Sequence, residues 1–171
     1  SFAMHLINSE RYLRSLEKVC CDGLSGKTVV VTGGTGMIGS CLVDALAVYN
    51  RSQSEPCRIV VTSRREEAAQ KRFSYCWDQP WFTYIRQDVC DEAVNWPDQV
   101  DYVIHAASNA DPVNFAKAPV DTLMANVLGT DRLLKAGMER GMKRFLYFFF
   151  GEMYEHLDAQ QSAFVQGYSG L

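Results

Sequence analysis

Three glycines follow a strand-like run near the start of the chain, at a spacing that suits phosphate binding. The run Thr28–Thr32 is β-branched, and Gly33, Gly36 and Gly39 follow it at intervals of three residues. An apolar pattern of helical spacing begins at once and continues to about Tyr49. A strand, a tight glycine turn and a helix in this order present backbone N–H groups and a helix N-terminus to a phosphate. The pattern predicts a site for the pyrophosphate of a dinucleotide. The alternative is a glycine-rich loop that binds nothing.

The elements that must position this turn alternate along the chain. Mostly continuous apolar runs predict strands at 28–32, 58–63, 82–87, 100–105 and 144–150. Helical spacing predicts helices at 9–22, 36–49, 65–76 and 119–140. Unbroken apolar runs are typical of strands buried on both faces of a parallel sheet, joined by right-handed crossovers. We therefore expect an α/β fold, a Rossmann-type doubly wound parallel sheet of order 3-2-1-4-5, with the nucleotide across the ends of strands 1 and 4.

Two of the predicted helices have a clear apolar stripe. In the N-terminal helix, the stripe consists of Leu13, Leu16, Val19 and Cys20 behind a capping Ser9. In the last helix, the side chains expected to face inward are Leu123, Val127, Leu133, Leu134 and Met138.

Length, charge and cysteine placement limit the class of protein. The 171 residues with a net charge of −3 fit one domain without a basic face for nucleic acid. No apolar run is long enough to span a membrane. The six cysteines form no C-x-x-C pair and do not cluster with the three histidines, so we expect no metal site and a reduced, cytoplasmic protein. No signal peptide is visible, and residues 1–3 are interpreted as an addition ahead of a start at Met4.

Five motifs carry a resemblance to a known family. In chain order they are Thr32-Gly33-Gly34-Thr35-Gly36-Met37-Ile38-Gly39, Asp88-Val89, Ile104-His105-Ala106-Ala107-Ser108, Asn126-Val127-Leu128-Gly129-Thr130 and Gly151-Glu152-Met153-Tyr154. With these motifs the chain resembles the extended short-chain dehydrogenase/reductases, in particular the nucleotide-sugar epimerases, dehydratases and decarboxylases. The resemblance implies that residues 27–155 are an NAD(P)-binding domain, and residues 156–171 are interpreted as a truncated or flexible tail.

The resemblance also implies ligands and roles for single residues. The cofactor would be NAD or NADP and the substrate a nucleotide sugar. Asp88 would accept a hydrogen bond from the adenine amino group, and the small Ala106 and Ala107 would let the dinucleotide lie over the end of strand 4. The implied cofactor-binding residues are Gly33, Thr35, Gly36, Met37, Ile38, Gly39, Ser63, Arg64, Asp88, Val89, Ala106, Ala107, Ser108 and Asn126.

Plainer interpretations of some of these residues stay open. Asp88 could be a turn residue at a strand end. Ala106 and Ala107 could serve strand–helix packing alone, and Asn126 could be a solvated helix residue. For His105, a buried structural histidine is favoured over a catalytic one.

The end of the second strand leaves the choice between NAD and NADP open. An acidic residue at this place normally binds the adenosine ribose of NAD, but the sequence here is Thr62-Ser63-Arg64-Arg65 and the first acid is Glu66. Two guanidinium groups suit a 2′-phosphate. Alternatively, both arginines belong to a solvated helix start, or Arg64 stacks on adenine.

The chain departs from the family pattern at the catalytic positions. Phe150 stands at the position of the catalytic Ser/Thr, within the run Phe148-Phe149-Phe150, and cannot donate a hydrogen bond. The Tyr-x-x-x-Lys pair, in which lysine lowers the tyrosine pKa for proton removal, is missing, because the chain ends three residues after Tyr168. We therefore expect no intact catalytic residue and no C-terminal substrate domain. The last strand would then be an exposed apolar edge, which favours a homo-oligomer.

Two functions compete at this stage. The first is the cofactor-binding part of an enzyme that oxidises C4 of a nucleotide sugar with bound NAD(P) and then epimerises, dehydrates or decarboxylates it, the chain alone being inactive. The second is a non-catalytic dinucleotide-binding protein or degenerate paralogue. A weaker third is a deliberately altered chain, in which the phenylalanine run is not native.

Overall fold

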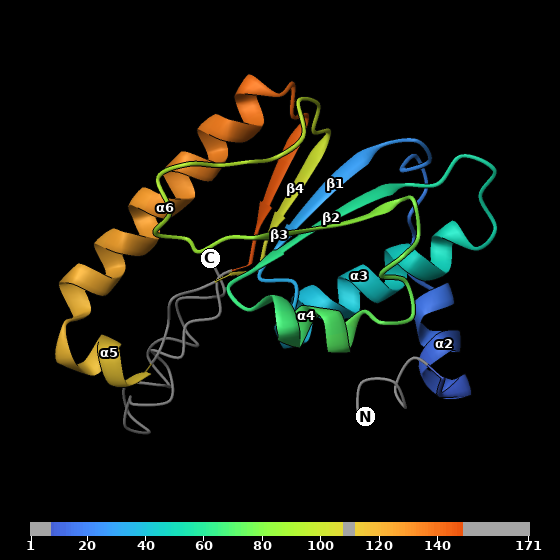
Figure 1. The fold of residues 1–171 in the computed structure, drawn as a ribbon, viewed down its shortest axis with the longest axis horizontal. Helices are drawn as coiled ribbons and strands as arrows, with labels where there is room; N and C mark the ends of the chain where they lie inside the picture. Colours follow the sequence, from blue (N-terminus) through green and yellow to red (C-terminus); the bar gives the residue numbers. More distant parts are fainter. Residues whose placement is uncertain (1–7, 108–111, 149–171) are drawn as a thin grey trace, which may run out of the picture.

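The computed structural model describes residues 8–107 and 112–148. Its centre is a five-stranded parallel sheet of order β3-β2-β1-β4-β5 (Figure 1). The strands are β1 (Thr28–Thr32), β2 (Arg58–Ser63), β3 (Phe82–Arg86), β4 (Tyr102–His105) and β5 (Arg144–Tyr147). The predicted α/β class and the predicted strand order are both confirmed.

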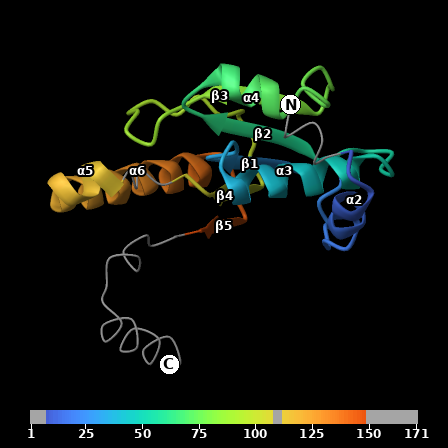
Figure 2. The ribbon, with the colours of Figure 1, turned by 90° about the horizontal axis from the view of Figure 1, so that it is seen from below.

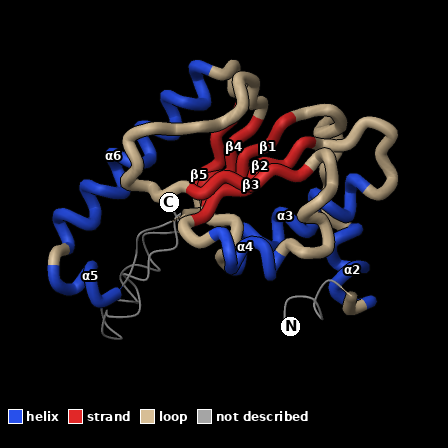
Figure 3. The backbone as a smooth tube through the Cα atoms, in the orientation of Figure 1, coloured by secondary structure: helices blue, strands red, loops and turns tan. Residues whose placement is uncertain are grey.

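Helices cover both faces of the sheet, as the continuous apolar strands require (Figures 1 and 3). The helices are α2 (Glu10–Glu17), α3 (Met37–Asn50), α4 (Glu66–Arg72), α5 (Pro112–Lys117) and α6 (Pro119–Glu139). Val29 and Val31 of β1 pack into the core beneath α3 and α4, whereas Val30 packs into a second core with Leu133 of α6. Alternate residues of one strand thus bury themselves on opposite faces.

The N-terminal helix is shorter than the predicted 9–22. Ser9 caps α2, with its hydroxyl accepting from the Tyr12 N–H at 3.5 Å, and Leu16 packs against Ala45 and Val48 of α3. The helix ends at Glu17, and Val19 is then 46% exposed rather than part of the apolar stripe. Cys20, also predicted in the stripe, is exposed, because the chain turns toward the core only at the buried Cys21.

Part of the predicted inward face of the last helix is also wrong. Leu133 is buried, but Leu123, Val127 and Met138 are 50%, 53% and 71% exposed. The first turns of α6, together with α5, project beyond the sheet (Figures 1 and 2), so they have no strand to cover. The short helix α5 was not predicted, and no described helix has the length and apolar character to cross a bilayer.

Candidate functional site

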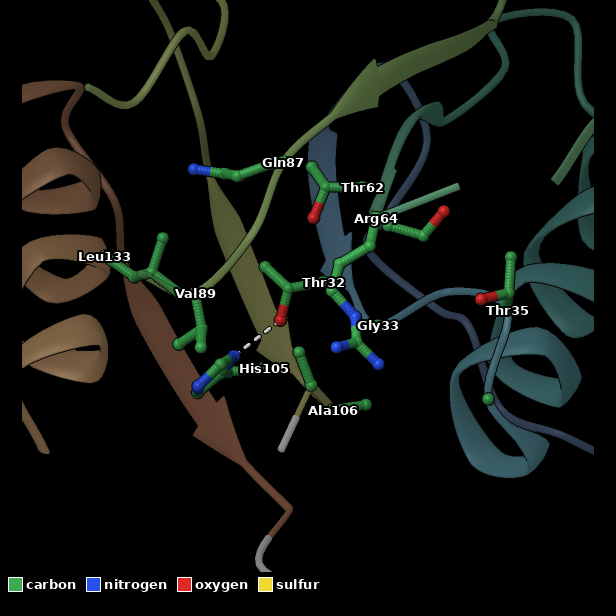
Figure 4. Close-up of a pocket in the computed structure, with 13 residues that line it drawn as sticks. Thr32, Gly33, Thr35, Thr62, Arg64, Gln87, Val89, His105, Ala106 and Leu133 are labelled. Atoms are coloured by element: carbon green, nitrogen blue, oxygen red, sulfur yellow. Dashed lines mark hydrogen bonds between the residues drawn. The ribbon is translucent and has the colours of Figure 1, made fainter. Parts of the chain in front are cut away.

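A cavity of about 280 Å³ opens beside the glycine turn at the carboxyl ends of the strands (Figure 4). It lies where the connections from β1 and β4 lead to opposite faces of the sheet, which is where doubly wound sheets bind ligands. The residues that line it are Thr32, Gly33, Thr35, Gly36, Thr62, Ser63, Arg64, Gln87, Val89, His105, Ala106, Ala107 and Leu133.

The glycine turn is held against the neighbouring strand ends. Gly33 has a φ of +63°, a region that favours glycine. A Cβ at this position would lie 2.5 Å from the backbone nitrogen of Ala107, after β4. The Gly34 N–H donates to the Thr62 carbonyl of β2 at 3.1 Å. The third glycine, Gly39, is needed because its Cβ would collide with the Gly33 carbonyl, so it packs on the turn itself rather than on the strand.

This turn fits the pyrophosphate of a dinucleotide. Helix α3 begins directly after Gly36 and has no side-chain cap and no acidic residue in its first turn. Its first N–H groups therefore remain available to an anion. A Cβ on Gly36 would have only the Gly33 carbonyl near it, at 3.3 Å, so the glycine leaves the cavity side open.

The structure brings eight of the predicted cofactor-binding residues to the cavity wall and leaves five away from it. Gly33, Thr35, Gly36, Ser63, Arg64, Val89, Ala106 and Ala107 line the cavity. The lining does not include Met37, Ile38, Gly39, Asp88 or Asn126. Met37 is 84% exposed and Asn126 is half-buried. Ser108 and the predicted catalytic-position residue Phe150 lie outside the described residues.

Asp88 stabilises the turn in which it lies through two hydrogen bonds. Its Oδ1 accepts from the Cys90 N–H at 3.0 Å, and its own N–H donates to Asp91 Oδ2 at 2.8 Å. These bonds are those of a turn residue at a strand end. They leave Asp88 with one further carboxylate oxygen for a ligand.

Helix α6 positions Val89 at the cavity wall through a close approach. A Cβ on Gly129 would lie 2.5 Å from the Val89 carbonyl oxygen, so only glycine lets the helix and the loop touch. One turn further on, Arg132 Nη1 donates to the Cys90 carbonyl at 3.1 Å. Within the motif at residues 126–130, Gly129 therefore shapes the cavity wall through its contact with Val89, whereas Asn126 does not line the cavity.

Four lining residues without an assigned role sit at strand ends or on the long helix. Thr32 ends β1, Thr62 is the last residue but one of β2, Gln87 follows β3, and Leu133 belongs to α6. The Gln87 side chain is held by Trp96, whose Nε1 donates to Gln87 Oε1 at 3.0 Å. The sequence signal of Thr32, Thr62 and Gln87 is their place at the predicted strand ends, and that of Leu133 is its predicted inward position on the last helix.

His105 is built into the floor of the cavity as a neutral, structural histidine. Its Nδ1 lies 2.5 Å from Thr32 Oγ1 and its Nε2 lies 3.3 Å from Thr130 Oγ1. The Tyr147 ring stacks on it at 5.0 Å between centroids. Burial lowers the pKa of His105 to about 4. A neutral ring donates at one nitrogen and accepts at the other, so the histidine ties β1, α6 and β5 together.

Acidification should therefore destabilise the domain through His105. The ordinary pKa of 6.5 applies to the unfolded chain, which takes up the proton first as the pH falls. The pH-dependent contribution of His105 to the free energy of unfolding is about 3 kcal/mol. It is fully present above pH 6.5 and is lost as the pH falls from about 6.5 to about 4. Urea unfolding at several pH values should show a steeper loss in the wild type than in His105→Gln. Equal slopes would mean that His105 is not the responsible group.

With the fold and the cavity described, the comparison with known proteins decides the family. The model of the NAD dependent epimerase/dehydratase family matches residues 29–167. The chain belongs to the NAD-dependent epimerase/dehydratase family. This confirms the family that the five motifs indicated.

Individual members and neighbours agree with this assignment. UDP-glucuronic acid decarboxylase 2 of Arabidopsis thaliana is 32% identical over 145 residues, covering 85% of this chain and 30% of that protein. Two solved structures at 20% identity share the fold. UDP-glucuronic acid 4-epimerase from Bacillus cereus, in complex with UDP-4-deoxy-4-fluoro-glucuronic acid and NAD, has a TM-score of 0.56, with 77% of this chain and 43% of that one covered. Gre2 from Candida albicans, in complex with NADPH, has a TM-score of 0.55, with 71% and 36% covered. The chain spans about a third of the length of the first curated relatives.

Proposed function

We propose that this chain is the dinucleotide-binding part of an enzyme that modifies a nucleotide sugar. The observation that carries the proposal is the glycine turn, where Gly33 at positive φ touches the backbone of Ala107 and opens a cavity at the ends of β1 and β4. The family and the name of the Arabidopsis relative support a nucleotide sugar as the substrate. Epimerisation, dehydration and decarboxylation are all compatible with a shared first oxidation at C4.

The residues of this chain serve the cofactor side of the reaction. When bound, NAD or NADP supplies the acceptor for a hydride from the sugar. The turn from Gly33 to Gly36 and the start of α3 hold the pyrophosphate, and Ala106 and Ala107 leave room above β4. His105 remains neutral and holds the three elements beneath the cavity in register. Because burial lowers its pKa to about 4, His105 carries no charge near neutrality and serves as a structural residue.

The location and assembly of the protein complete the proposal. The described cysteines are all free thiols, which suits a reducing cytoplasm. Among the described strands, β5 is at the edge of the sheet next to β4, and its Leu146 is 52% exposed. We expect the chain to form a homo-oligomer, and a monomer by light scattering at micromolar concentration would contradict this expectation.

A non-catalytic dinucleotide-binding protein is the second candidate. It is favoured by the sequence Phe149-Phe150, at the place where the family has small hydroxyl residues. The double variant Phe149→Ser/Phe150→Ser, made within a full-length chain that carries the Tyr-x-x-x-Lys pair, separates the two, with UDP-glucuronic acid as the probe. Cofactor reduction that appears only in the variant supports an altered enzyme, and continued inactivity with intact cofactor binding supports the second candidate.

The first experiment is thermal unfolding of the chain with NAD, with NADP and with neither. A ligand that binds only the folded state, at about a hundred times its dissociation constant, adds about 2.7 kcal/mol of stability. A clear rise in the melting temperature with at least one dinucleotide is expected. If neither raises it, the cavity does not bind a dinucleotide and the proposed function is wrong.

A further inference from the structure

Among the residues that the structure describes, the wall of the cavity has one charged side chain, and it is basic. Of the thirteen lining residues, Arg64 is the charged member, since His105 is neutral and the lining contains neither aspartate nor glutamate. Arg64 is exposed at the rim and directly follows β2. Figure 4 shows its side chain extending from the end of β2 toward the glycine turn.

Arg64 has no carboxylate to neutralise it in the described part of the chain. The ion pairs found there join other residues, among them Arg14, Lys71, Arg72, Arg86, Lys135, Arg140 and Lys143. The nearest acid in sequence is Glu66, in the first turn of α4, and it does not line the cavity. Within residues 8–107 and 112–148, the guanidinium thus lies at the cavity as a positive charge without a paired carboxylate.

The position at which NAD-binding sheets carry an acid is occupied by a serine that is already engaged. Ser63 is the last residue of β2 and is buried, with its hydroxyl 2.8 Å from the Tyr84 hydroxyl. The same Ser63 hydroxyl donates to the Arg65 carbonyl at 3.4 Å. Because both neighbours of Arg64 are held, the backbone of Arg64 is fixed at the cavity rim. The described part of this wall contains no carboxylate that would pair with the two ribose hydroxyls.

The end of β2 is the side of the cavity that receives the adenosine ribose in doubly wound sheets. The Gly34–Thr62 hydrogen bond of 3.1 Å ties this strand end to the turn that would hold the pyrophosphate. A 2′-phosphate on that ribose would carry its negative charge to Arg64. A guanidinium can bind phosphate oxygens through two parallel N–H donors, and such charge-assisted bonds are stronger than bonds to neutral hydroxyls.

We infer that this site prefers NADP to NAD, and that Arg64 is the residue that reads the 2′-phosphate. The inference rests on the proposed function, because it concerns the same cavity. It extends beyond the family description, which speaks of NAD, and it separates Arg64 from the neighbouring Arg65 at the start of α4.

The test measures binding to the 171-residue chain by calorimetry, with no turnover needed. NADP should bind at least about tenfold more tightly than NAD, as one charge-assisted bond predicts. Adenosine 2′,5′-bisphosphate should likewise exceed adenosine 5′-monophosphate. Arg64→Gln should remove most of the preference, because it weakens the binding of NADP much more than the binding of NAD. Arg65→Gln is the matched control, since Arg65 does not line the cavity, and it should keep the preference.

Three outcomes would overturn the inference. Equal or tighter binding of NAD would mean that Arg64 does not read a phosphate. An equal loss of NAD and NADP in Arg64→Gln would mean that the guanidinium stacks on adenine instead. If Arg65→Gln removes the preference for NADP and Arg64→Gln keeps it, the 2′-phosphate binds to Arg65 and not to Arg64. Each of these leaves the proposed function intact, whereas binding of neither dinucleotide contradicts the proposed function itself.

Discussion

A Gly33→Ala variant should lose measurable dinucleotide binding and about 2–4 kcal/mol of unfolding free energy. The added methyl group would lie 2.5 Å from the Ala107 nitrogen and 2.6 Å from its Cα, both backbone atoms that cannot rotate away. The end of β4 must therefore move away from β1. This movement deforms the wall that the dinucleotide is proposed to contact. Urea unfolding and calorimetric titration with NADP measure the two effects.

The chain offers a matched control for the strain of the turn. Gly141 also has a positive φ, +77°, but a Cβ there would meet no atom within 4 Å. Gly141→Ala should lose only the cost of a left-handed alanine, about 1 kcal/mol, and keep dinucleotide binding. If the two variants lose the same stability and both bind NADP, the contact between Gly33 and Ala107 does not shape the site.

The second large effect is expected at Asp44, where Asp44→Ala should lose about 3–5 kcal/mol. The Asp44 side chain is fully buried in α3 and forms a bidentate ion pair with Arg72, at the end of α4. It also accepts from the Tyr12 hydroxyl at 2.5 Å and the Tyr75 hydroxyl at 2.6 Å. Burial, reinforced by this carboxylate, raises the pKa of both phenols. Removing the carboxylate would leave a largely buried guanidinium without a counter-charge.

Urea unfolding of paired variants isolates this network from general surface effects. Arg72→Met should be about as destabilising as Asp44→Ala, because either change leaves one buried partner alone. Lys71→Met is the control, since the neighbouring Lys71–Glu67 pair is exposed and contributes less than about 1 kcal/mol. Tyr12→Phe should lose about 1 kcal/mol by removing one hydrogen bond from α2. A loss below about 1 kcal/mol in both Asp44→Ala and Arg72→Met would show that the network contributes little.

The Asp44 network could not be predicted from the sequence. About thirty residues separate Asp44 from each of its partners Tyr12, Arg72 and Tyr75, and a strand lies between them in the sequence. In the sequence, Asp44 looks like an ordinary polar residue of a helix. The same holds for His105, whose two threonine partners are 73 and 25 residues away. The sequence favoured a structural histidine but named no partner for it.

Much of the site's frame, in contrast, follows from the sequence alone. The five strand-like runs, the glycine spacing after Thr32 and the alternation with helices are local and periodic signals, because β-branched runs and glycine turns restrict the backbone of the residues that carry them. Right-handed crossovers then leave few possible strand orders. The family motifs added the expectation of a dinucleotide at the ends of β1 and β4.

Only the tertiary structure decided which of the predicted residues reach the cavity. Asp88 turned out to bond within its own loop, and Gly129 rather than Asn126 sets the approach of α6. The exposed Leu123 and Val127 follow from the length of α6 beyond the sheet, which helical periodicity cannot reveal. Whether an arginine has a counter-charge depends likewise on every carboxylate near it in space. Local backbone preferences therefore determine the order of helices and strands, whereas contacts, burial and charge balance arise from long-range packing.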